Sequence, residues 1–477
     1  MNFRKIKYPL FASMMAFIAA FSASCADDLE IGGTTDESKY QGIYTLNAHL
    51  KDVVTNSASP IVELYTDDSK ASVRLSLSKA PSAALSVKLA IDEAYLTTYN
   101  QAHGTDFKLY PTSLVALDNE GVMNFDSDKV SSELSLKIST NTELEEDVTY
   151  VIPLAVEEVN GNVQFANEEA RHCMYLVKDM RSKGNAFKGD DLPKGILFFE
   201  VNDVNPLNAL CFQLENGKYL WDAVVLFAGN INYDPVAGRP FVNCNPNVQF
   251  LLDNNEEYLQ PLRKRGIKVI LGILGNHDQA GVAQLSPIGC KDFARELAQY
   301  CYAYNLDGVN FDDEYSDPNP DLNNPAFAYR SYEAGARLCL ETKRAMPDKL
   351  VTVFDYGYMH GTNSVDGVSA EEYTDIAVPD YHSGAANLRG NMTNKQVAGF
   401  SMEFMLQRGG NLNPEGAKRL LDGGYGWFMG FAPFPNRFSL IWDRLTGAET
   451  LYGSPLKDPT FFYKKNDTKK YAWPAEL

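Results

Sequence analysis

The chain has 477 residues, of which 45% are hydrophobic and 22% are charged, so it is long enough for two or more globular domains. Its 43 basic and 62 acidic side chains give a formal net charge of −19. This balance argues against a nucleic acid as partner, because neutralising phosphates requires clustered Lys and Arg. A neutral partner such as a glycan is compatible with it. Only six His residues limit the scope for metal sites, and we expect neither a metal nor a cofactor.

The first residues have the features of an export signal. Basic residues precede an apolar run over residues 8–21, which is too short to span a bilayer, and small residues lead to Cys25. They resemble a lipoprotein box, in which the cysteine becomes the lipidated first residue. We therefore expect a signal peptide over residues 1–24 and a lipidated acidic tether over residues 25–39. The acidic residues after Cys25 resemble the signal that places lipoproteins of Bacteroides-type bacteria on the outer cell face, so we expect an exported outer-membrane lipoprotein.

Residues 40–182 have the rhythm of an all-β domain. Apolar residues alternate or cluster over residues 72–77, 85–89, 133–138 and 151–156, and turn residues separate these runs. One short helical stretch over residues 93–101 interrupts them. Several short strands at this spacing favour a β-sandwich. The segment has no catalytic motif, so we expect an accessory domain that acts as a spacer or binds glycans, followed by a polar linker over residues 183–194.

From residue 195 to 477 the pattern changes to short apolar runs separated by helical stretches. We expect eight strands, over residues 196–200, 223–228, 267–274, 306–314, 350–355, 375–381, 397–405 and 426–432. We expect helices between them, over residues 256–265, 291–304, 326–345 and 415–421. Apolar strands alternating with helices predict a parallel sheet that is buried on both faces. Eight such repeats predict an α/β protein with a (β/α)8 TIM barrel, whose chemistry lies at the C-terminal ends of the strands. A doubly wound sheet is the rival, but no GxGxxG follows the first strand.

The fourth run carries three polar residues at alternate positions. Side chains alternate between the two faces of a strand, so Asn310, Asp312 and Glu314 share one face. Val309 and Phe311 share the other face and are expected to pack toward the helices. Unpaired buried carboxylates are costly, so this spacing indicates a functional site inside the barrel.

The segment from Asp307 to Tyr315 resembles the strand-four signature of glycoside hydrolase family 18, Asp-Gly-x-Asp-x-Asp-x-Glu. Asp307, Gly308, Asp312 and Glu314 match it, and Asn310 stands where Asp is commonest. The sequence Phe-Asp-Asp-Glu-Tyr is similar to the endo-β-N-acetylglucosaminidases, which cut between the two core GlcNAc units of N-glycans. This resemblance extends to residues 270–277 on strand three and covers most of residues 195–477. With its lipoprotein head and sandwich, the chain resembles the Bacteroides surface endoglycosidases that act on high-mannose glycans.

The resemblance implies a retaining mechanism in which the substrate's own acetamido group is the nucleophile. It implies that Glu314 is the general acid and base, and that Asp312 orients the acetamido N–H. Tyr381 matches a family tyrosine whose hydroxyl bonds the acetamido oxygen. The implied partners are N-glycans on glycoproteins and a lipid anchor, with no nucleic acid, and we expect a monomer.

Further residues at strand ends are candidates for glycan contact. They are Asn276 and His277 after strand three, Asn310 and Tyr315 on and after strand four, Asp355 and Tyr356 after strand five, and Trp427 on strand eight as a floor for the sugar. Residues 275–278 also resemble the GNHD element of metallophosphoesterases, but no HxH is present. Residues 317–328 lack the Gly and Glu of a calcium loop. A chitinase and a non-catalytic glycan-binding lipoprotein remain the alternatives.

Overall fold

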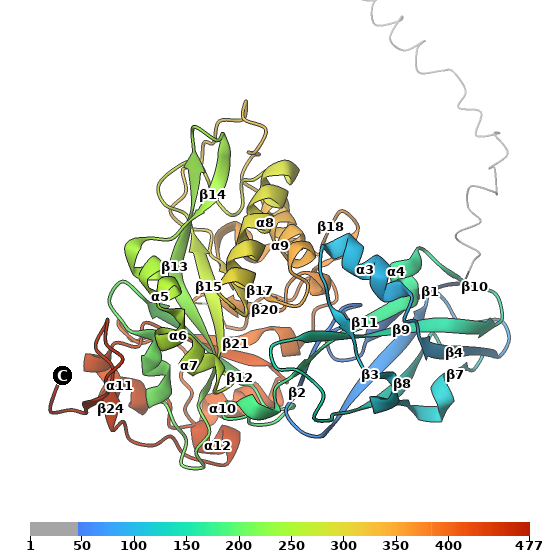
Figure 1. Ribbon diagram of the computed structural model, residues 1–477, viewed down its shortest axis with the longest axis horizontal. Coiled ribbons are helices and arrows are strands. Elements are labelled where there is room, and N and C mark those ends of the chain that lie inside the picture. Colours follow the sequence, from blue (N-terminus) through green and yellow to red (C-terminus); the bar gives the residue numbers. More distant parts are fainter. Residues whose placement is uncertain (1–45, 383) are drawn as a thin grey trace, which may run out of the picture. The chain divides into compact units, whose positions relative to one another are not determined.

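The computed structural model describes residues 46–382 and 384–477. The predicted signal peptide over residues 1–24, the lipidation site Cys25 and the tether over 25–39 lie outside the described residues. No helix in the described part of the chain combines the length and the apolar character that a membrane span requires. Residues 46–477 form one compact unit, in which a β-rich part precedes a mixed α/β part (Figure 1).

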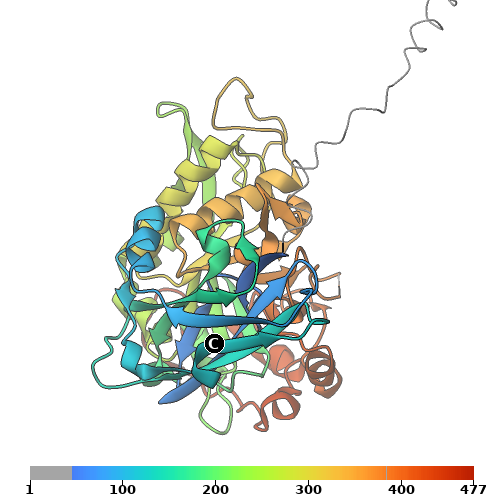
Figure 2. The ribbon, with the colours of Figure 1, turned by 90° about the vertical axis from the view of Figure 1, so that its right-hand side faces the viewer.

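The β-rich part consists of two sheets. The first has the strand order β10-β1-β3-β8-β6, and the second has the order β2-β11-β9-β4-β7 with β5 paired to β9. The strands are β1 (Leu46–Asp52), β2 (Ile61–Leu64), β3 (Asp68–Leu77), β4 (Leu85–Ile91), β5 (Lys108–Leu109), β6 (Val115–Leu117), β7 (Val122–Phe125), β8 (Ser131–Ser139), β9 (Thr149–Asn160), β10 (Val163–Phe165) and β11 (His172–Asp179). Figure 2 views the chain from the side of these strands.

Apolar side chains from both sheets meet in one core. Leu75 of β3 and Leu136 of β8 come from the first sheet, and Leu154 of β9 comes from the second. Alternate residues of β3 and β8 are buried, as expected for strands with one face on a core. The four strands predicted in this part are confirmed, as is the short helix, which is α3 (Tyr95–His103); α4 (Glu168–Arg171) was not expected.

The mixed part is built on eight parallel strands. These are β12 (Lys194–Glu200), β13 (Trp221–Asp234), β15 (Lys268–Leu274), β16 (Gly308–Phe311), β17 (Leu350–Asp355), β20 (Ile376–Pro379), β21 (Ala398–Glu403) and β23 (Trp427–Phe431). They pair in parallel in the order β20-β17-β16-β15-β13-β12-β23-β21. A parallel bridge between Ala377 and Val397 links β20 to the segment that enters β21. All eight predicted strands are confirmed, and the pairing is compatible with the predicted barrel.

In the described part of the chain, six helices lie between these strands, and two follow the last strand. Those between the strands are α5 (Pro246–Asp253), α6 (Asn255–Tyr258), α7 (Gln260–Arg263), α8 (Pro287–Ala303), α9 (Tyr332–Ala345) and α10 (Pro414–Asp422), and those after β23 are α11 (Phe438–Asp443) and α12 (Ala448–Tyr452). The helix predicted over 326–345 starts later, because Ser331 caps α9 by accepting a hydrogen bond from the Ala334 N–H. The helix predicted over 256–265 is two short helices, and Pro261 lies in the first turn of the second.

Short antiparallel strands extend the sheet or form separate hairpins. β14 (Arg239–Asn243) pairs with the end of β13, and β22 (Arg408–Gly409) pairs with β21. Two further hairpins are β18 (Ser364–Val365) with β19 (Val368–Ser369) and β24 (Phe461–Phe462) with β25 (Tyr471–Ala472).

The two faces of the parallel strands contribute to different cores. Val309 and Phe311 of β16 belong to the core shared with the helices, as predicted. A separate apolar cluster includes Ile196, Val225 and Ile270 from neighbouring strands. Asn310 lies on the face of β16 opposite Val309 and is fully buried. The polar face of the fourth strand is therefore turned away from the helices.

Polar contacts join the β-rich part to the N-terminal ends of the parallel strands. Lys178 of β11 lies 3.3 Å from Asp348, and Lys268 of β15 lies 2.9 Å from Glu63. Residues 183–194, predicted as a linker, are packed: Ala186 is buried and Lys188 pairs with Asp222 at 2.9 Å.

Gly308 tests the close packing of the central strands. A Cβ atom at this position would lie 2.2 Å from the Leu350 carbonyl oxygen, so backbone must move to accept it. We expect Gly308→Ala to lower the melting temperature, with a cost of about 1–3 kcal/mol. Gly184→Ala is the control, because its Cβ would meet only one atom at 3.8 Å and its φ is −78°. Equal melting temperatures of the two variants would contradict the packing argument.

Candidate active site

The acidic segment after β16 is held by the backbone of the strand-three loop. The Asp312 N–H donates to the Ile273 carbonyl at 3.0 Å, and the Gly275 N–H donates to the Glu314 carbonyl at 3.1 Å. The strand was predicted to run to Glu314 but ends at Phe311, so these bonds take over from regular pairing. A Cβ at Gly275 would lie 2.3 Å from the Glu314 carbonyl oxygen. Gly275, the residue after the third strand, therefore leaves space for the backbone of the acidic segment.

Asp312 is a buried carboxyl group without a counter-charge. It is 3% exposed, and its Oδ1 atom has no hydrogen-bond partner among the described residues. Burial raises its pKa well above the ordinary value, and the charges of Glu314 and Asp313 raise it further. Asp312 therefore holds a proton at a pH where an exposed aspartate is ionised.

Asn310 lies two residues before Asp312. Its Nδ2 donates to the Thr352 hydroxyl at 2.8 Å, and that hydroxyl donates to the Val309 carbonyl at 3.1 Å. The Oδ1 atom of Asn310 has no partner among the residues that the structure describes. The amide orientation is thus set by Thr352 of β17, and the Oδ1 atom remains an unused acceptor among the described residues.

Glu314 is the more accessible of the two predicted catalytic carboxyls. It is half-buried, whereas Asp312 is buried. Desolvation raises the pKa of Glu314, and the charge of Asp313 adds to this effect. A carboxyl group that retains its proton and still faces solvent has the properties of a general acid.

Asp313, between the two, serves a different purpose. It lies 2.8 Å from an Arg330 guanidinium nitrogen and accepts the Tyr358 N–H at 2.8 Å. A Cβ at Gly357, whose φ is +55°, would lie 2.8 Å from the Asp313 carboxylate. Asp313 therefore ties the acidic segment to the loop after β17.

Tyr381 lies two residues after β20 and faces the acidic segment. Its ring packs against Phe354 and Phe431, with centroids 6.0 and 5.9 Å away. Burial raises its pKa well above the ordinary value, and the nearby carboxylates, Asp312 foremost, add to the increase. The hydroxyl is thus kept protonated beside the carboxyl groups, ready to donate a hydrogen bond.

A cavity of about 440 Å³ opens beside Tyr315. The predicted contact residues Asn276, His277 and Tyr315 line it. So do residues that were not predicted, which are Glu200, Asn202, Phe227, Asn230, Asn243, Asn245 and Asn247. Burial and the charge of Asp203 raise the pKa of Glu200.

Six asparagines between residues 202 and 276 thus line one cavity. The side-chain amide of Asn247 donates to Asn202 at 2.9 Å. Asn232, which is outside the lining, accepts from both Asn276 at 3.0 Å and Asn243 at 2.8 Å. The alternating Asn243, Asn245 and Asn247 was the available sequence signal for this wall. Neutral donors and acceptors in this number suit the hydroxyl groups of a sugar better than a charged ligand.

Asp355 and Tyr356 end β17 in contrasting surroundings. Asp355 is buried, lies 2.7 Å from Arg389 and 2.8 Å from His360 Nδ1, and accepts the Asn387 N–H at 2.8 Å. Its oxygens are therefore occupied by the surrounding loops. Tyr356 is 42% exposed and lies beside Phe354, with ring centroids 5.9 Å apart.

Trp427 is not brought to this group. It is the first residue of β23 and pairs with Lys194, the first residue of β12, so it lies at the N-terminal ends of the strands. Phe431, at the other end of β23, packs on Tyr381 instead. Within residues 46–382 and 384–477, no group of three or more His, Cys, Asp or Glu side chains is arranged to hold a metal ion.

Comparisons with known proteins identify relatives of this chain. A family model described as "-like, N-terminal domain" matches residues 45–163. Endo-beta-N-acetylglucosaminidase F1 of Elizabethkingia meningoseptica is 46% identical over 279 residues, which are 56% of this chain and 81% of that protein.

Two crystal structures of EndoBT-3987 from Bacteroides thetaiotamicron are also similar to this chain. The one with Man5GlcNAc product is 57% identical, with a TM-score of 0.87. The one in complex with Man9GlcNAc2Asn substrate is 54% identical, with a TM-score of 0.80. Each match covers 90% of this chain and 100% of the other.

Adjacent aspartates provide a test of the site's electrostatics. The folded pKa of Asp312 is raised above the value in the unfolded chain, about 3.9. Ionisation of Asp312 therefore lowers the free energy of unfolding. This loss of stability is absent at low pH, where the carboxyl is protonated in both states, and it develops as pH rises from the unfolded toward the folded pKa. We expect Asp312→Asn to melt above the wild type by a few degrees at pH 8, and this difference to shrink toward pH 4.

The matched control is Asp313→Asn, which has the opposite sign. Arg330 loses its charged partner, so we expect a loss of roughly 2–3 kcal/mol at neutral pH. Thermal unfolding of both variants from pH 4 to 8 checks this pair. A pH-independent effect of Asp312→Asn would contradict the raised pKa.

Proposed function

Because this chain belongs to the endo-β-N-acetylglucosaminidases, which are glycoside hydrolases, we propose that it cleaves the β-1,4 bond between the two core GlcNAc residues of N-glycans. The observation that carries the proposal is the pair Asp312 and Glu314, both with raised pKa, beside Tyr381 and a polar cavity. A neutral, hydroxyl-rich ligand fits that wall of asparagines. High-mannose glycans are the proposed class, since relatives of 54–57% identity are described with Man9GlcNAc2Asn and Man5GlcNAc.

We propose that the eight parallel strands form the (β/α)8 barrel of glycoside hydrolase family 18. The strand order and the bridge from Ala377 to Val397 support this closure. Asp312, Glu314 and Tyr381 all follow the C-terminal ends of their strands, where barrel enzymes place their chemistry.

Glu314 is the proposed proton donor to the leaving oxygen. Its half-buried position admits a substrate, and its raised pKa keeps the proton available at a pH where an exposed glutamate is ionised. The substrate's 2-acetamido oxygen would then attack its own anomeric carbon, giving an oxazolinium-type intermediate. Water activated by ionised Glu314 would open this ring from the same side, so that the anomeric configuration is retained.

Asp312 is proposed to orient the acetamido group. An ionised Asp312 accepts the acetamido N–H and stabilises the positive charge that develops on it. In the free protein, burial instead favours the protonated form. Binding of a group that gains positive charge would therefore lower the pKa of Asp312 when it is needed as a base. Tyr381, kept protonated, would donate to the acetamido oxygen.

We propose that the mature protein is an exported lipoprotein, anchored through acyl chains on Cys25 at the outer face of the outer membrane. The basic start, the apolar run and the small residues before Cys25 support this. Its partners would be glycoproteins outside the cell, and the chain would act as a monomer. The excess of acidic residues is compatible with such a neutral substrate.

The product on a high-mannose glycoprotein tests the function. We expect mass spectrometry to find one GlcNAc left on each glycosylated Asn. Glu314→Gln keeps the side-chain size but removes the proton, so we expect a rate at least about 10²-fold lower with glycan binding retained. Intact glycans with cleavage of chitin oligomers would favour a chitinase instead, and full activity of the variant would remove Glu314 from its role.

A preformed sugar oxazoline separates the roles of the two carboxyls. Asp312→Asn should slow formation of the intermediate more than its hydrolysis, because Asp312 acts on the acetamido group before the ring closes. Rates with an intact glycopeptide and with the oxazoline give the two values. Equal slowing of both steps would count against Asp312 as the orienting group.

A further inference from the structure

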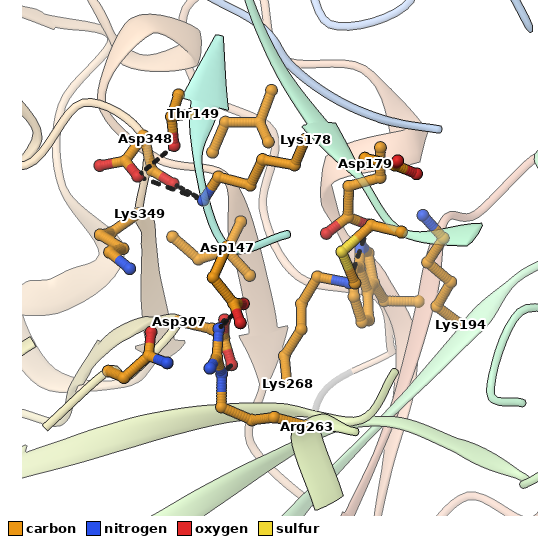
Figure 3. A pocket seen from close by; sticks show the side chains of 16 residues that line it. Asp147, Thr149, Lys178, Asp179, Lys194, Arg263, Lys268, Asp307, Asp348 and Lys349 are labelled. Carbon is orange, nitrogen blue, oxygen red and sulfur yellow. Dashed lines mark hydrogen bonds and ion pairs between the residues drawn. The ribbon is translucent and has the colours of Figure 1, made fainter. Parts of the chain in front are cut away.

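A second cavity lies where the two sheets meet the N-terminal ends of the parallel strands. Its volume is about 150 Å³, and polar residues from both parts line it (Figure 3). Lys178 and Asp147 come from the β-rich part, and Asp307 and Lys349 immediately precede β16 and β17. The proposed active site is at the opposite ends of these two strands.

Every carboxylate that lines this cavity is already paired. Asp307 lies 2.9 Å from Arg263, Glu63 lies 2.9 Å from Lys268, and Asp348 lies 3.3 Å from Lys178. Asp147 lies 3.4 Å from Arg263 of the lining and also pairs with Lys183 outside it, and Asp179 pairs with Arg181 outside it. The hydrogen bonds and ion pairs drawn in Figure 3 include those of Asp348 and Asp147.

Lys349 is the exception among these charges. It is 7% exposed, and its ammonium has no hydrogen bond or ion pair within the described part of the chain. The ammonium lies over the Tyr302 ring, 5.3 Å from the centroid. Burial lowers the pKa of Lys349, and the charge of Lys178 adds to this, while the Asp348 and Asp307 carboxylates partly offset it without pairing with the ammonium. A desolvated ammonium without a partner carries a cost that an anion would remove.

Two further residues of the lining offer hydrogen-bond donors, one charged and one neutral. The Lys194 ammonium lies over the Trp427 ring at 5.9 Å and has no carboxylate at ion-pair distance among the described residues. In Figure 3, Lys349 and Lys194 stand on opposite sides of the view. The side-chain amide of Asn305 also lines the cavity, with no hydrogen-bond partner in the described ranges. It offers an uncharged donor next to the charged ones.

We propose that this cavity binds a small inorganic oxyanion, of the size of phosphate or sulfate, against the Lys349 ammonium. A single water needs only about 10–15 Å³ of such space, so 150 Å³ leaves room for a tetrahedral anion and some water. The anion joins the two parts of the chain, because its neighbours come from both. It stabilises this contact and leaves the chemistry at the other strand ends unchanged.

Thermal unfolding of the full chain tests the proposal with inorganic phosphate as the probe. Phosphate is varied up to 20 mM at pH 7.5, with sodium gluconate, a larger anion, holding the ionic strength constant. We expect the melting temperature to rise and saturate, as for a ligand that binds the folded state. Lys349→Met should abolish this rise, and the hydrolysis rate should not respond to phosphate.

The control variant is Lys129→Met, whose side chain is 61% exposed on the β-rich part. It should keep the full phosphate response. A wild-type chain that shows no saturating rise, or a Lys349→Met variant that shows the same rise as the control, overturns the proposal.

A crystallographic measurement of anion binding uses the wild-type chain and does not depend on whether a variant folds. Wild-type crystals grown without phosphate or sulfate are soaked in selenate, and the selenium is located by anomalous scattering. A peak within hydrogen-bond distance of Lys349 Nζ supports the site. A cavity without selenium at saturating soak concentration contradicts it.

Discussion

The cost of burying a carboxyl group without a counter-ion is the constraint on which the site depends. Asp312 is buried and has no cation beside it among the residues that the structure describes, while the next residue, Asp313, pairs with Arg330. A destabilising carboxylate and a stabilising one are thus adjacent in the chain. Asp313 fixes the loop after β17, and Asp312 has a raised pKa that the reaction can use.

The rest of the fold makes this expensive arrangement possible. Gly275 leaves space for the Glu314 backbone, and the Ile273 carbonyl holds Asp312 in place. Two apolar cores, one toward the helices and one between the strands, stabilise the fold. They offset the free-energy cost of the buried carboxyl group. The contact with the β-rich part lies at the N-terminal ends of the parallel strands, and the proposed active site lies at their C-terminal ends. Structural contacts and chemistry thus occupy opposite ends of the same strands.

Much of the fold and part of the site follow from local pattern. All eight parallel strands and four of the strands in the β-rich part were predictable, because buried strands are short apolar runs between turn residues. The packing of Val309 and Phe311 toward the helices, with Asn310 on the other face of the strand, was also correct. Boundaries were less predictable: the fourth strand ends at Phe311, since loop contacts replace the regular pairing.

The sequence alone determined the strand pattern, the spacing of Asp312 and Glu314, and the resemblance that names their chemistry. Only the tertiary structure decided which residues surround them. Trp427 begins its strand and lies at the wrong end for a sugar contact, while Phe431 takes the place beside Tyr381. The asparagine wall and the unpaired Lys349 likewise depend on segments far apart in the chain. Spacing along a strand is a local property, but burial and charge partners are set by whatever else packs there.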